Sequence, residues 1–191
     1  EFEYHHKGLW DESLPPGELL VVPCATVEPI VLIVQRGRTP HEDSCVVTIG
    51  ASTHAALRHH ECVAQPPKLK YRTMLELRDV PYARVVDEAT WGGLWYAMHA
   101  AGSRGPADVL YRVVVPLLTG LSLEHAMVAS RKSADAAGLP PLPMRSARRV
   151  RADFGVGRSA LRYLLTRVHG LGSLQAKHVS LLLRLQMLSF A

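Results

Sequence analysis

The first part of the chain alternates short, dense apolar runs with chain-breaking residues, a pattern typical of β-strands separated by turns. Proline and glycine mark the breaks, because Pro cannot donate to a strand ladder and Gly favours turns. Arg72–Leu77 alternates between two sets of positions and predicts a further strand, and the region up to Val86 is consistent with another. The three densest runs, which we predict as strands, are Glu18–Cys24, Pro29–Val34 and Cys45–Ile49.

After Val86 the composition becomes helical, beginning with a segment rich in Ala and Trp. Ser122 precedes the last of these segments and is a predicted N-cap, because its side-chain oxygen can accept a hydrogen bond from a first-turn amide. Strands followed by helices indicate an α+β fold, with an N-terminal mixed body followed by a basic helix–Gly turn–helix segment. The predicted helices are Ala51–His60, Asp87–Ala101, Ala107–Leu118 and Ser122–Ala137.

The stretch Gly-Leu-Pro-Pro-Leu-Pro at residues 138–143 is the clearest linker, since consecutive prolines favour a stiff, extended chain. The net charge of the chain changes sign at this place. We therefore predict three parts: an extension body at residues 1–138 that binds other proteins, a Pro-rich linker at 139–144, and a basic segment at 145–191.

The basic segment reads as helix, tight glycine turn, helix. Leu161, Leu164, Leu165 and Val168 recur at helical spacing, and Gly170 then stands where the helix should stop with a positive φ. Gly172 and Ser173 open the next helix, with Ser173 a possible N-cap. Such a turn directs backbone N–H groups outward at a helix N-terminus, where a phosphate oxygen can bind. An ordinary helical hairpin is the alternative.

The formal net charge of +5 hides a strong asymmetry. Residues 141–191 hold nine Lys and Arg against Asp153 alone, a net charge of +8, whereas residues 1–140 hold 13 basic and 16 acidic side chains, a net charge of −3. A basic segment attached to a slightly acidic body favours contact with a polyanion. The nine basic residues are Arg145, Arg148, Arg149, Arg151, Arg158, Arg162, Arg167, Lys177 and Arg184.

Little in the body indicates catalysis. The three cysteines, Cys24, Cys45 and Cys62, are widely spaced, so we interpret them as buried free thiols, with His59 and His60 at the surface rather than in a zinc site. Trp91, Trp95 and Tyr96 could form a stacking platform, but we favour packing into the core. Phosphate-binding glycine loops and runs of eighteen apolar residues are both missing. We expect no enzyme, no cofactor, no metal, no membrane contact and no small-molecule substrate.

The run from Arg149 to Ala176 resembles the start of small-subunit ribosomal protein thirteen. Arg149-Val150 matches the basic and aliphatic opening of that family, Leu165-Thr166 matches the end of its first helix, and Gly170-Leu171-Gly172 with Ala176 matches its glycine turn without a gap. His169 replaces the usual aromatic residue, and residues 155–157 depart from the family's proline-containing loop. The similarity covers about residues 145–190.

This resemblance implies a structural role in the head of the small ribosomal subunit, with ribosomal RNA and neighbouring small-subunit proteins as partners. A long extension on a bacterial-type ribosomal protein implies a mitochondrial ribosome. The turn amides and the basic side chains would then bind RNA backbone phosphates. The implied RNA-binding residues are Arg149, Arg151, Arg158, Arg162, Arg167, Gly170, Gly172, Ser173 and Lys177.

Two other functions are compatible with the same residues. Helix-hairpin-helix DNA-binding proteins, including repair enzymes, share the Gly-x-Gly-x-x-x-Ala spacing, but residues 172–191 hold no Asp or Glu that could serve as their catalytic carboxylate. The third possibility is a protein–protein adaptor whose basic end aids solubility.

Overall fold

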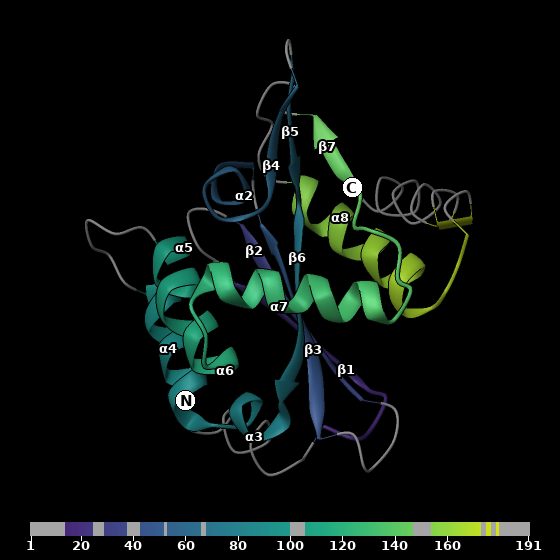
Figure 1. The fold of residues 1–191 in the computed structure, drawn as a ribbon. Helices are drawn as coiled ribbons and strands as arrows, with labels where there is room; N and C mark the ends of the chain where they lie inside the picture. Colours follow the sequence, from purple (N-terminus) through teal and green to yellow (C-terminus); the bar gives the residue numbers. More distant parts are fainter. Residues whose placement is uncertain are drawn as a thin grey trace, which may run out of the picture.

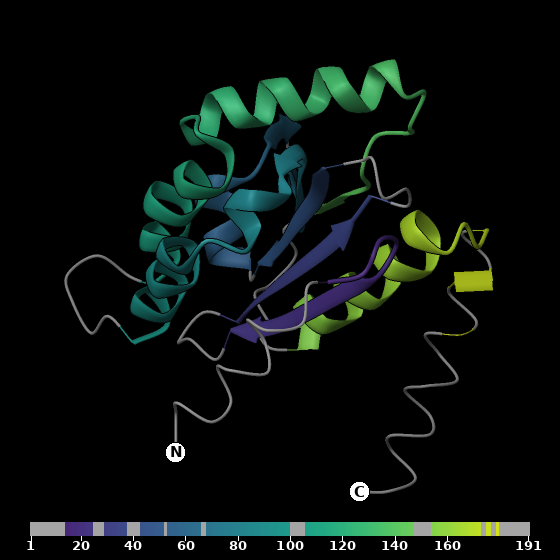
Figure 2. The ribbon, with the colours of Figure 1, turned by 90° about the horizontal axis from the view of Figure 1, so that it is seen from below.

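A computed structural model of the 191-residue chain describes residues 14–24, 29–37, 43–51, 53–65, 68–99, 106–146, 154–172, 175–176 and 179. This part of the chain has an α+β fold, as the sequence predicts. A four-stranded antiparallel sheet lies between helices on both of its faces, and a smaller three-stranded sheet extends from one end (Figure 1, Figure 2).

The larger sheet has the strand order β1 (Leu19–Cys24), β2 (Ile30–Arg36), β3 (Ser44–Ala51) and β6 (Met74–Pro81), with every neighbouring pair antiparallel. The three strands predicted from dense apolar runs are confirmed, with ends that differ by one or two residues. Apolar residues follow one another in these runs because the sheet is buried on both faces. Residues that point to either face must therefore be apolar. In β2, Ile30, Leu32 and Val34 face one hydrophobic cluster, whereas Val31 and Ile33 face the other.

The smaller sheet has the order β4 (Cys62–Gln65), β5 (Lys68–Arg72) and β7 (Met144–Ser146) and was not predicted. Its strands are short and partly exposed, so they include polar or charged residues and lack the dense apolar signature of a buried strand. Residue Thr73 separates β5 from β6, and its carbonyl accepts from the amide of Ala51. The strand predicted at Arg72–Leu77 is therefore largely β6, which continues to Pro81.

One face of the larger sheet is covered by α4 to α7 (Figure 1). The predicted helices are confirmed in this region, and the Ser122 hydroxyl accepts from the His125 amide at 3.4 Å as the N-cap of α7. The further strand expected up to Val86 is wrong, because β6 ends at Pro81 and the single helical turn α3 (Tyr82–Val85) follows. The helices are α2 (Thr53–His59), α4 (Glu88–His99), α5 (Pro106–Val109), the π-helical turn η1 (Leu110–Val114), α6 (Val115–Thr119) and α7 (Leu123–Ala136).

The opposite face is covered by α8 (Phe154–Tyr163) and the π-helical turn η2 (Leu164–Val168) (Figure 2). Val156, Ala160 and Tyr163 are buried against Val31, Ile33 and Met74 of the sheet. Leu164 and Val168 from the predicted apolar stripe pack at the margin of this cluster, but its centre lies on residues that the stripe did not include.

The Pro-rich linker joins two parts of one packed unit. It runs into β7, which pairs with β5 through Tyr71 opposite Arg145, and then leads to α8 on the body's own sheet. The boundary predicted at residues 139–144 therefore does not separate two independent cores within the described residues. The reason is that α8 supplies the second apolar layer that strands such as β2 require.

Among the described helices, none is by itself both long and apolar enough to cross a membrane. The bent pair Ala107–Thr119 and Leu123–Ala136, with 55° between its halves, reaches that length and composition together.

Candidate nucleic-acid interface

The glycine turn that ends the first basic helix is formed as predicted. Gly170 has a φ of +65°, and the Leu171 amide donates to the Leu165 carbonyl at 2.9 Å across the end of η2. This pattern terminates a helix and places the next residues outside it. A Cβ added at Gly170 would meet no other atom, so the demand for glycine here comes from backbone conformation alone.

Gly172 stands at the start of the helical residues that follow the turn, and the predicted N-cap Ser173 lies outside the described residues. The Ala176 amide donates to the Gly172 carbonyl at 2.9 Å, which makes Gly172 the N-cap residue. Gln175 reaches back with its Oε1 to accept from the Gly172 amide at 3.0 Å, as the third residue of a capping box does. The Gly172 amide that the sequence assigned to a phosphate is therefore already bonded to Gln175.

Arg167, another predicted phosphate ligand, is directed into the protein. Its Nε lies 3.1 Å from Oε2 of Glu76 and its Nη2 3.3 Å from Oε1, while Nη1 donates to the Pro140 carbonyl at 2.9 Å. Only 13% of the Arg167 side chain and 6% of the Glu76 side chain are exposed. Arg167 thus holds η2 and the linker against β6 and presents little charge to the surface.

Tyr163 completes this buried network. Its hydroxyl accepts from Thr48 at 2.8 Å and donates to Glu76 at 3.3 Å, and Arg78 also contacts the Glu76 carboxylate. Thr48 and Glu76 lie directly opposite each other on β3 and β6. Burial, followed by the neighbouring negative charge of Glu76, raises the pKa of Tyr163, so this phenol stays protonated.

Arg158 and Arg162 lie four residues apart on α8, so their side chains share one side of the helix. Arg158 is exposed and Arg162 is half-buried. Arg145 of β7, which the sequence analysis counted but did not select, joins them. We call these three residues, Arg145, Arg158 and Arg162, the arginine cluster.

The electrostatics of the cluster show that its members repel one another. Partial burial lowers the pKa of Arg145, and the positive charges of Arg158 and Arg162 lower it further, while Tyr71 opposes them. Arg145 therefore lies in the electric field of two arginines of α8, and such a concentration of positive charge attracts anions.

Four predicted RNA-binding residues, Arg149, Arg151, Ser173 and Lys177, lie outside the described residues. Of the others, the structure brings Arg158 and Arg162 together, turns Arg167 inward, and leaves Gly170 and Gly172 exposed at the turn. Arg145 was missed because its place depends on the pairing of β7 with β5. A single basic residue after a Pro-rich stretch gives no local signal of that pairing.

The cysteine and histidine interpretation is confirmed in part. Cys24 and Cys45 are buried free thiols, but Cys62 is exposed. Burial raises the pKa of Cys24 and Cys45 to about 11 each. His60 is buried rather than at the surface, because it bonds to Tyr111 inside the core. Within the described residues there is no group of three metal-ligating side chains.

The aromatic residues of α4 also differ in their burial. Trp91 packs against the core and donates to the Val85 carbonyl at 2.7 Å, as predicted. The same expectation is wrong for Trp95 and Tyr96, which are 44% and 60% exposed, with Trp95 stacked on His99.

Comparisons with known proteins return no match of this chain to a family model, to a curated protein or to a solved structure.

Proposed function

We propose that this chain binds RNA through the arginine cluster, as a structural constituent of the small ribosomal subunit head, in mitochondria. The observation that carries the RNA contact is the position of Arg145 on β7 within the electric field of Arg158 and Arg162 on α8, which gathers three positive charges from two separate elements. A phosphodiester backbone supplies negative charge that such a basic surface attracts, and arginine matches phosphate with two parallel donors.

The ribosomal part of the proposal is supported by the resemblance of Arg149–Ala176 to small-subunit protein thirteen and by the formed turn at Gly170. We place the RNA contact on the outer side of α8 rather than at the turn amides. The Gly172 amide already donates to Gln175, and Arg167 is already paired with Glu76. The sheet and helices of the body are then an architectural addition that contacts neighbouring proteins.

The direct test is fluorescence anisotropy of the full chain with a labelled RNA stem-loop at two salt concentrations. Three phosphate contacts predict that a fourfold rise in salt weakens binding by about 40-fold. The triple variant Arg145→Gln, Arg158→Gln, Arg162→Gln should bind more weakly and respond less to salt. Arg131→Gln is the matched control, since Arg131 lies on α7 with its side chain 69% exposed.

Arg167 must be left intact in these variants. Its replacement would break a buried ion pair, so any loss of binding would report unfolding rather than a lost phosphate contact. Salt-independent affinity, or equal binding by the triple variant, would contradict the RNA contact. A DNA duplex that binds as tightly as the RNA would favour the helix-hairpin-helix alternative.

The ribosomal assignment is tested by sedimentation of the native protein from cells that express it. Migration with small subunits that shifts to the free fractions for the triple variant supports the assignment. A native protein that stays in the free fractions while the purified chain still binds RNA would overturn the ribosomal role alone.

A further inference from the structure

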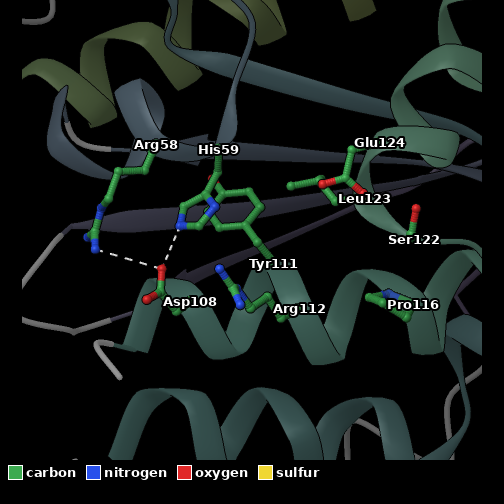
Figure 3. A pocket seen from close by; sticks show the side chains of 9 residues that line it. All are labelled: Arg58, His59, Asp108, Tyr111, Arg112, Pro116, Ser122, Leu123 and Glu124. Carbon is green, nitrogen blue, oxygen red and sulfur yellow. Dashed lines mark hydrogen bonds and ion pairs between the residues drawn. The ribbon is translucent and has the colours of Figure 1, made fainter. Parts of the chain in front are cut away.

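A cleft of about 620 Å³ opens between the end of α2, the helix formed by α5, η1 and α6, and the start of α7 (Figure 3). Its volume lies in the range of ligand sites, and charged, aromatic and apolar side chains converge on it from three elements. The sequence predicts no small-molecule site, because the cleft forms only when the end of α2 meets Asp108, 49 positions after His59. The lining residues are Arg58, His59, Asp108, Tyr111, Arg112, Pro116, Ser122, Leu123 and Glu124.

His59 is fixed in this cleft with one ring nitrogen oriented. Its Nε2 lies 2.8 Å from Oδ1 of Asp108, and its ring is stacked on Tyr111 with centroids 4.3 Å apart. The side chain is 9% exposed, and burial lowers its pKa, so the ring is neutral and Nε2 carries the proton toward Asp108. Nδ1 is then an acceptor, and it makes no hydrogen bond with a described residue.

The floor beneath His59 is rigid. The Tyr111 hydroxyl lies 2.5 Å from Nε2 of His60, whose Nδ1 lies 2.9 Å from the Arg72 carbonyl. A carbonyl can only accept, so His60 donates from Nδ1, and its Nε2 accepts a hydrogen bond from the Tyr111 hydroxyl. Tyr111 lies in the π-helical turn η1, a distortion often found at functional sites.

Arg112 and Glu124 project into the same space from opposite walls (Figure 3). Arg112 makes no ion pair or hydrogen bond with another described residue. Glu124 is held ionised at the start of α7, since its own amide, Ser122 and the charge of Arg112 lower its pKa. Asp108, by contrast, is already engaged within the protein, by the charge of Arg58 at 3.7 Å and by the hydrogen bond from His59.

The cleft therefore offers one available cation and one available anion. A purely anionic ligand paired with Arg112 would meet the Glu124 carboxylate, and a purely cationic ligand paired with Glu124 would meet the Arg112 guanidinium. A molecule that carries both charges satisfies both walls at once.

We propose that this cleft binds a zwitterionic ligand, an α-amino acid or a dipeptide, with its carboxylate on Arg112 and its ammonium group on Glu124 and Nδ1 of His59. The ligand's side chain would then lie against Leu123 and Pro116. This site is separate from the arginine cluster, so it does not depend on the proposed RNA contact.

The test uses the full chain with each standard α-amino acid and with glycylglycine at about 10 mM, measured by thermal shift and then calorimetry. At least one of these probes should raise the melting temperature by about 2 °C or more. Acetate and methylammonium, which each carry one of the two charges, should not.

Arg112→Gln and Glu124→Gln should each weaken the best probe by about tenfold or more while the unliganded chain keeps its melting temperature. Arg131→Gln and Glu88→Gln, which alter exposed charges away from the cleft, should leave the affinity unchanged. The absence of any shift with every probe, equal shifts with acetate, or unchanged affinity in both cleft variants would overturn the proposal. RNA binding by Arg112→Gln should equal that of the unmodified chain.

Discussion

Arg167 at the end of η2 forms a buried bidentate ion pair with Glu76 of β6, 91 residues earlier in the chain. The pair attaches the basic segment to the body, and through Pro140 it also fixes the linker. Arg167, one of the residues that give this segment its positive charge, therefore holds the fold together.

Glu76→Gln should destabilise the protein by about 3 kcal/mol, because it leaves Arg167 and Arg78 buried without a carboxylate. Urea unfolding measures this change. Glu88→Gln, an exposed substitution in the first turn of α4, should change the free energy of unfolding by less than about 1 kcal/mol. Equal effects of the two substitutions would show that the network contributes nothing specific.

Arg145→Gln should affect stability and RNA binding in opposite directions. Removing one of three repelling charges raises the free energy of unfolding, by about 0.5–1 kcal/mol, while one phosphate contact is lost. Thermal unfolding and anisotropy with the same preparation compare the two. A variant that loses both stability and binding would indicate that Arg145 is mainly a packing residue against Tyr71.

Lowering the pH should destabilise the protein through His60. Burial lowers its pKa from 6.5 to about 4, so between these values the unfolded chain takes up a proton that the native chain does not. Stability should therefore be constant for this group above pH 6.5, fall as the pH decreases toward 4, and lose on the order of 3 kcal/mol in all.

Urea unfolding at several pH values, with His60→Gln for comparison, checks this window. The variant should start from a lower stability but show a shallower slope between pH 6.5 and 4. An unchanged slope would mean that other groups dominate acid unfolding.

Gly157 provides a matched control for testing the turn by substitution at Gly170. Both are exposed with no atom near an added Cβ, but Gly170 has a positive φ and Gly157 lies inside α8. Gly170→Ala should destabilise by about 1 kcal/mol or more, whereas Gly157→Ala should stabilise by about 0.5–1 kcal/mol. Changes of the same sign in both variants, measured by thermal unfolding, would contradict the role of the turn.

The parts of the fold that the sequence predicts are those with local causes. The run at Ile30–Val34 is apolar throughout because helices cover both faces of β2, and Ser122 is recognisable as an N-cap from its neighbours alone. The smaller sheet has no such signature. Strand β7 forms by pairing with the free edge of β5. The position of that edge depends on the fold and cannot be read from the residues of β7.

The candidate sites depend still more on distant partners. Whether Arg167 faces RNA or the interior is decided by Glu76 on β6, and whether His59 lies at the surface or in a cleft is decided by Asp108, 49 residues later. Residue type and spacing identify a concentration of basic residues in the last quarter of the sequence. They do not distinguish an arginine that pairs with a buried carboxylate, such as Arg167, from one that is exposed, such as Arg158.

The position of α8 also has a consequence for biosynthesis. A nascent chain that has emerged only as far as the prolines would leave Val31, Ile33 and Met74 uncovered on an otherwise completed sheet, and such a surface invites chaperone binding or aggregation. Residues 154–168 thus cover this face of the sheet as well as carrying positive charge, and we expect a chain that ends before them to aggregate.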